Sequence, residues 1–292
     1  MGVLKDELQG FVPTPQAAEI MKMVARGSRV LRLSKVEQMD SETKKFNVLT
    51  DGPGAYWVSE GQRIQTSKAT WIHPEITAKK LAVIIPVTKE KLNDSTINVF
   101  NELKESIAEA FYKSLDAAAL FGTDSPFKTN VMKGVSENGQ TVSHGATSLD
   151  LDVSDAMAYV EDAGYDVSGF VAHVGIKNAL RKLRDGDGNQ LLVSGVNGGE
   201  FYNAPIEFVR NGAFDRRKAD ILAGEWKYSL VGVRQGIEYE VLKEATLQGT
   251  RARMASHILA EQDMVAIKAT IRVGYLVVKP EVRGGGTHRG LS

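Results

Sequence analysis

The hydrophobic pattern between residues 46 and 87 predicts two extended arms that form a long β-ribbon. The second arm has the period of two that is typical of a strand, because Leu81, Val83, Ile85 and Val87 alternate with Lys80, Ala82, Ile84 and Pro86. A two-stranded ribbon has no second layer against which it can bury large side chains. We therefore expect the ribbon to lie on another surface, and a neighbouring copy of the chain is the simplest candidate. Its apolar residues are Phe46, Val48, Leu49, Tyr56, Trp57 and Val58 in the first arm and Trp71, Ile72, Ile76, Leu81, Val83, Ile85 and Val87 in the second.

Other patterns predict helices on both sides of this ribbon. Thr14-Pro15 opens a helix that closes at Gly27, and Val30–Leu33 is predicted to be a short strand. From residue 97 to 121, apolar residues recur every three or four positions, which predicts one long helix of about 35–40 Å. Such a helix is long for a chain of this size, and we expect it to act as a structural beam.

A second compact region begins near Ser148, where short helices alternate with apolar strands. Long alternating strands follow at residues 237–242 and 264–278, and we expect them to return and pack against the long helix. The region that begins at Ser148 is then an insertion between two halves of one domain. These elements predict an α+β fold.

Composition and charge narrow the classes of function. The chain has 292 residues, of which 42% are hydrophobic, so it has enough apolar residues to fill a core. Its 36 Lys and Arg residues balance its 36 Asp and Glu residues, whereas proteins that bind nucleic acid tightly usually have a basic excess. The longest apolar run, residues 81–87, is too short to span a bilayer, so we expect no membrane partner.

The candidate chemistry is weak, and we expect neither an enzyme nor a cofactor or metal. The chain has no cysteine, and its five histidines do not have zinc-site spacing. His173 lies within an apolar strand and is interpreted as a core histidine with satisfied hydrogen bonds. Residues 185–189 resemble a calcium loop, but Gln190 and Val196 stand where Gly and Glu are required. A soluble hydrolase remains an alternative, although no nucleophile, base and orienting group form a known pattern.

The ribbon carries the candidate functional residues. Trp57 and Trp71 are interpreted as inter-subunit anchors, because aromatic side chains bury a large area with few rotatable bonds. The alternative is that both belong to the core of a larger sheet. Near the tip, Glu60, Arg63 and Lys68 are candidates for inter-subunit ion pairs, or else form a solvated tip. Arg251, Arg253 and Lys268 are basic residues that either contact DNA or are simply solvated.

Several motifs resemble the major capsid protein of tailed bacteriophages, the Hong Kong 97-like fold family. Tyr56-Trp57-Val58-Ser59-Glu60-Gly61 is similar to the extended loop of that family, and residues 79–90 are similar to its second ribbon arm. The sequence at 117–123 resembles the end of the spine helix, and that at 262–274 resembles the returning strands. The likeness covers nearly the whole chain.

The resemblance implies a Hong Kong 97-like fold with an N-terminal arm, an extended β-hairpin loop, a long spine helix, a peripheral domain and an inserted axial domain. The expected divisions are 1–34 for the N-terminal arm and first helix, 35–88 for the extended loop, 89–147 for the peripheral domain with the spine helix, 148–255 for the axial domain, 256–283 for the returning strands of the peripheral domain, and 284–292 for a flexible tail.

The family also implies a coat protein that assembles itself into the icosahedral head of a tailed phage, as hexamers and pentamers around double-stranded DNA. The expected partners are other copies of the chain, a portal, a decoration protein and DNA contacted without sequence specificity. Assembly is expected in the host cytoplasm, with the virion as the final location. The alternative with the same fold is an encapsulin-type bacterial nanocompartment shell.

Two departures from the family pattern shape these expectations. Only a short arm precedes the first helix, so we expect a separate scaffolding protein instead of a fused assembly domain. The name-giving family member links its subunits through an isopeptide bond between a ribbon Lys and a late Asn. Lys68 is a possible donor, but no Asn follows Asn211, and we therefore expect a non-covalent shell.

Overall fold

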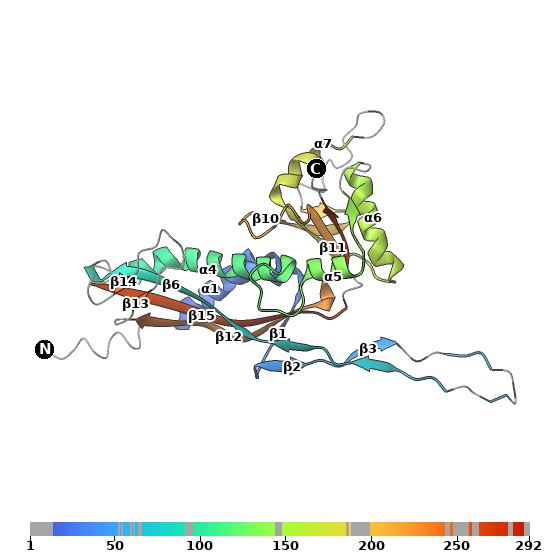
Figure 1. The fold of residues 1–292 in the computed structure, drawn as a ribbon, viewed down its shortest axis with the longest axis horizontal. Coiled ribbons are helices and arrows are strands. Elements are labelled where there is room, and N and C mark those ends of the chain that lie inside the picture. The colour runs from blue at the N-terminus through green and yellow to red at the C-terminus, as the bar shows by residue number, and fades with distance from the viewer. Residues whose placement is uncertain are drawn as a thin grey trace.

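The computed structural model of the chain combines two main β-sheets, a long helix and a projecting ribbon (Figure 1). It describes residues 14–51, 53, 55–58, 60, 62–63, 66–90, 96–143, 148–184, 187, 199–242, 246–247, 257–258, 263–279 and 283–288.

The first sheet has four strands in the order β1-β12-β15-β6. Strand β1 is parallel to β12, and the other two pairs are antiparallel. One face is covered by two helices, α1 (Thr14–Gly27) and α4 (Thr96–Phe121), whose apolar side chains pack on β15. The predictions of a long helix and of late strands that return to it are therefore confirmed. The strands are β1 (Lys35–Gln38), β12 (Ser229–Leu242), β15 (Met264–Val277) and β6 (Lys79–Thr88).

The second sheet has six strands in the order β7-β16-β11-β8-β10-β9. Two helices, α6 (Leu149–Asp162) and α7 (Lys177–Lys182), belong to this part of the molecule, which lies beyond the C-terminal end of α4 (Figure 1). The strands are β7 (Val142–Ser143), β8 (Gly169–His173), β9 (Glu200–Phe201), β10 (Ala204–Val209), β11 (Ile221–Gly224) and β16 (Arg283–His288). A separate pair is formed by β13 (Thr246–Leu247) and β14 (His257–Ile258).

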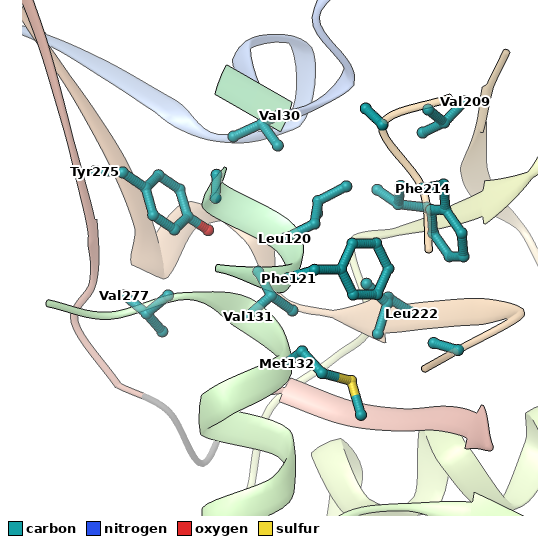
Figure 2. Packing of buried hydrophobic residues seen from close by; sticks show 14 of the residues in the cluster. Val30, Leu120, Phe121, Val131, Met132, Val209, Phe214, Leu222, Tyr275 and Val277 are labelled. Carbon is teal, nitrogen blue, oxygen red and sulfur yellow. The ribbon is translucent and has the colours of Figure 1, made fainter. Parts of the chain in front are cut away.

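One hydrophobic cluster joins the two sheets (Figure 2). Leu120 and Phe121, at the end of α4, are buried there together with residues of helix α5 (Val131–Glu137) and of both sheets. The ring of Phe121 meets that of Phe214 edge to face, with the centroids 4.9 Å apart. The helix therefore acts as the expected beam, because its last turn is part of the core that both sheets share.

The ribbon consists of two short antiparallel pairs. Strand β2 (Thr43–Lys45) pairs with β5 (Glu75–Thr77), and β3 (Val48–Asp51) pairs with β4 (Thr70–Ile72). Beyond β3 and β4 the ribbon projects away from the rest of the molecule (Figure 1).

The structure corrects the expected divisions of the chain in three places. Strand β6 was assigned to the ribbon, but it pairs with β15 along its length. The apolar side chains on one face of β6 thus pack within the same chain. Strand β12 was placed in the axial region, but it pairs with β15 as well. Residues 284–288 of the tail that was predicted to be flexible lie in β16, whose backbone pairs with β11, and the remaining tail residues lie outside the described part of the chain.

The predicted strand at Val30–Leu33 is also wrong, because these residues lie in helix α2 (Arg29–Leu33). The Oγ of Ser28 accepts a hydrogen bond from the Leu31 N–H and donates one of 2.5 Å to the buried carboxylate of Asp116 on α4. That carboxylate also accepts from the N–H groups of Arg29 and Val30. Tertiary capping thus overrides the strand preference of Val30.

Burial dominates the titration of Asp116. The loss of solvent raises the pKa of this carboxyl from 3.8 to about 6, although the hydrogen bonds from Ser28, Arg29 and Val30 act in the opposite direction. The folded state therefore binds the proton more tightly than the unfolded chain does. The resulting stabilisation is complete below about pH 4 and is lost as the pH rises through about 6.

We predict that Asp116→Asn removes this part of the pH dependence. The measured quantity is the difference in the free energy of unfolding, wild type minus variant. This difference should fall by on the order of 1–3 kcal/mol as the pH rises from 4.5 to 7.5. Chemical denaturation of both proteins at several pH values measures this difference, in which the other carboxyls cancel. A difference that does not change with pH would contradict the raised pKa.

Candidate assembly surface

The ribbon is held together by backbone pairing and by contacts between side chains of its two arms. Leu49 lies opposite Trp71, and Val48 lies opposite Ile72. The register shifts between Leu49 and Asp51, which marks a bulge in the first arm. Closer to the body, Nδ1 of His73 lies 2.8 Å from Oδ1 of Asn47. Directly opposite residues share a face of a strand pair, so Leu49 and Trp71 form one apolar cross-strand pair.

The outer part of the ribbon exposes large apolar side chains. Trp57 is fully exposed, and Trp71 retains 53% of its accessible surface. Such residues gain free energy when they are removed from water, at about 25 cal/mol per Å² of apolar area. A row of them at one end of a subunit is typical of a surface that another protein covers. The other exposed apolar residues of the ribbon are Leu49, Tyr56, Val58 and Ile72.

The inner part of the predicted apolar set is covered by the chain itself, which corrects the expectation that the whole ribbon needs a neighbour. Ile76 is completely buried, and Val87 is nearly so. Phe46 and Val48 are partly buried against the cluster that contains Met39 and Ile76. Three further residues of the second arm lie in β6 and pack against the core cluster that α1 and α4 form with β15, namely Leu81, Val83 and Ile85.

The three charged candidates near the tip, Glu60, Arg63 and Lys68, are all exposed. No other residue in the described part of the chain forms an ion pair with them. Nearer the body, Nζ of Lys128 lies 2.8 Å from the carboxylate of Glu75, and this hydrogen bond lowers the pKa of Glu75. The structure therefore brings together the exposed apolar residues and leaves the tip charges available to a partner.

The structure gives little support to the three basic residues that were candidates for DNA contact. Arg251 and Arg253 lie outside the described residues. Nζ of Lys268 lies 2.6 Å from the carboxylate of Glu240 on the neighbouring strand, so its charge is already paired.

Sequence reasoning missed the residues that hold the base of the ribbon. Met39 and Ile76 are buried against Gly232 of β12 and Gly274 of β15. A glycine within an alternating strand indicates a close approach by another backbone or side chain, and this signal was available at both positions.

Within the described ranges, no cluster of three or more His, Cys, Asp or Glu residues is suited to a metal ion. Nδ1 of His173 accepts a hydrogen bond of 2.9 Å from the Gly175 N–H, which agrees with its interpretation as a satisfied histidine. No helix in the described part of the chain is long and apolar enough to cross a membrane.

Comparison with known proteins now identifies the family, because residues 9–282 match the phage capsid family. The chain belongs to this family. The major capsid protein of Staphylococcus phage 80alpha is 31% identical over 273 residues, which cover 93% of this chain and 83% of that protein. A solved structure from Microbacterium phage Oxtober96 matches with a TM-score of 0.74 and 30% identity, over 86% of this chain and 85% of the other. One from Mycobacterium phage Adephagia matches with a TM-score of 0.77 and 28% identity, over 91% of each chain.

Membership of the phage capsid family confirms the resemblance to phage major capsid proteins and supports a coat protein of the virion. These matches favour a phage coat protein over the encapsulin-type alternative, and the family is one of structural capsid proteins. The subunit therefore functions by associating with other subunits, and its exposed apolar ribbon is the surface to test.

We predict that the ribbon's two tryptophans contribute little to the stability of the isolated subunit. Trp57→Ala should change the free energy of unfolding by less than about 0.5 kcal/mol, because the side chain is exposed. Ile76→Ala should lower it by about 2–4 kcal/mol, because that side chain is fully buried. Chemical denaturation of unassembled subunits measures both. A loss above 1 kcal/mol for Trp57→Ala would show that the chain covers its own ribbon.

Proposed function

We propose that the chain has the Hong Kong 97-like fold and builds an icosahedral phage head from hexamers and pentamers. In this proposal the ribbon of each subunit lies over a neighbouring subunit. The single observation that carries the proposal is the exposure of the outer ribbon, where the described part of the chain leaves Trp57 and Trp71 uncovered. The four-stranded sheet, the long helix α4 and the second sheet support the proposed fold.

The aromatic pair is the proposed source of binding free energy. Buried aromatic residues dominate the energetics of protein interfaces, whereas exposed ion pairs contribute about 0–1 kcal/mol each. Glu60, Arg63 and Lys68 accordingly set the position of the ribbon on its neighbour more than they strengthen the contact. A closed shell repeats each contact many times, so a modest contact at each ribbon is enough to hold the particle together.

The other partners remain predictions that follow from the family resemblance. They are double-stranded DNA, a portal, a separate scaffolding protein and a decoration protein. A chain with balanced charge would contact DNA weakly and without sequence preference, as expected for a container that must enclose any packaged sequence.

The test compares assembly of variants under conditions in which the wild-type chain forms particles. We predict that Trp57→Ala combined with Trp71→Ala lowers the yield of closed particles at least tenfold, because both anchors are lost. Trp57→Phe is the matched control, since it keeps an aromatic ring at the same position and should assemble. Electron microscopy and sedimentation measure the yield. Closed particles at wild-type yield from the double alanine variant would contradict the proposal.

A further inference from the structure

Two glycines lie opposite each other beneath the base of the ribbon. Gly232 of β12 is the direct register partner of Gly274 of β15. Both are in the interior of long strands, where glycine costs conformational entropy and contributes no side chain to packing. Neither has a positive φ, so the backbone conformation does not require glycine at either position. Glycine is therefore required at these two positions because other atoms occupy the space that a side chain would need.

That space is filled by two side chains of the ribbon base. Met39 lies between β1 and β2, where the chain enters the ribbon, and Ile76 lies in β5, where the chain returns. Met39 is 1% exposed and Ile76 is 0% exposed. The entry and the exit of the ribbon are therefore both seated in the hollow above the glycine pair.

The fit leaves no room for a methyl group. A Cβ at Gly274 would lie 2.8 Å from Cγ1 of Ile76 and 2.8 Å from the backbone oxygen of Thr77. A Cβ at Gly232 would lie 2.9 Å from Cδ1 of Ile76 and would also collide with Sδ of Met39. The two positions differ in kind, because the sulfur is the end of a flexible side chain, whereas the Thr77 oxygen belongs to the strand itself.

Backbone hydrogen bonds fix the same region. The Met39 N–H donates to the Val233 oxygen at 3.0 Å, and the Ala78 N–H donates to the Glu42 oxygen at 2.8 Å. These bonds attach the base of the ribbon to the sheet at one end and close the ribbon on itself at the other. Seated side chains and bonded backbone together leave the base little freedom to tilt.

We propose that Gly232 and Gly274 form a socket that fixes the direction in which the ribbon leaves the body of the subunit. The two glycines are positioning residues, which act through Met39, Ile76 and Thr77. This inference rests on the proposed function, in which the direction of the ribbon decides where it meets the neighbouring subunit.

The length of the ribbon amplifies any movement at its base. From Lys45 to Trp57 the chain advances twelve residues, or about 40 Å at roughly 3.3 Å per residue. A tilt of about 10° at the base then moves Trp57 by about 7 Å, which is enough to remove a side chain from its contact surface. A single methyl group in the socket is thus expected to disturb a contact far from it.

The experiment measures the direction of the ribbon in unassembled subunits. The chain has no cysteine, so Gln62→Cys and Ser136→Cys, at exposed positions on the ribbon and on α5, accept a pair of spin labels. Gly274→Ala should shift the mean distance between the labels by about 5 Å or more, because the Thr77 backbone must move. Gly232→Ala should shift it less, because Met39 can turn aside. Gly236→Ala is the matched control in the same strand, where a Cβ meets nothing within 4 Å, and should leave the distance unchanged.

Several outcomes would overturn the socket. One is a wild-type distance distribution in Gly274→Ala, and another is a broad distribution in the wild-type subunit, which would show that the ribbon has no fixed direction. If Gly274→Ala does not fold, the test uses Gly232→Ala alone and combined with Met39→Ala. The double variant should restore the wild-type distance between the labels, because it removes the sulfur with which the new Cβ collides. Failure of that rescue would also overturn the proposal. These measurements need no assembly, so a negative result leaves the role of Trp57 and Trp71 as a separate matter.

Discussion

The structure depends on one ribbon whose apolar side chains are buried near its base and exposed in its outer part. Its inner part is seated firmly, because Ile76 fills a hollow in the four-stranded sheet and β6 continues from the second arm into that sheet. Its outer part leaves Trp57 and Trp71 exposed among the described residues, and a two-stranded ribbon cannot bury both of its faces. The chain therefore anchors the base of an apolar surface that it leaves exposed. A subunit that must join others can use such a surface, whereas a monomer would gain nothing from it.

The rest of the fold connects the base of the ribbon to both sheets through helix α4. Helix α4 lies along the four-stranded sheet and ends in the core shared with the second sheet, where Leu120 and Phe121 are buried. Nearer the C-terminal end of α4, the carboxylate of Asp116 accepts hydrogen bonds from the first turn of helix α2 and so ties the N-terminal helices to the same beam. The core contacts link both sheets to one helix, so forces applied at the ribbon are transmitted to a single body.

The sequence predicted the large elements because their periodicity is long and regular. The helix at 97–121, the ribbon and the returning strands all exist, and the capsid motifs led to the right family. Errors arose where tertiary contacts outweigh local preference. Val30–Leu33 has the composition of a strand but is capped as a helix by Ser28 and Asp116, and the glycine-rich tail becomes a strand by pairing with β11. The two aromatic residues proposed from the sequence as anchors, Trp57 and Trp71, are exposed, and their role between subunits stays a prediction, whereas Met39 at the base of the ribbon was not foreseen. Periodicity identifies apolar faces, and it does not show which of them will be covered by the same chain.

The central claim is that assembly covers a surface that the isolated subunit exposes. The most direct measurement is acrylamide quenching of tryptophan fluorescence in a Trp71→Phe variant, which leaves the exposed Trp57 and the buried Trp226. We predict strong quenching of one emitting component in free subunits and its loss in assembled particles, because Trp57 becomes buried against a neighbour. Equal quenching of that component before and after assembly would show that the ribbon remains uncovered and would contradict the account.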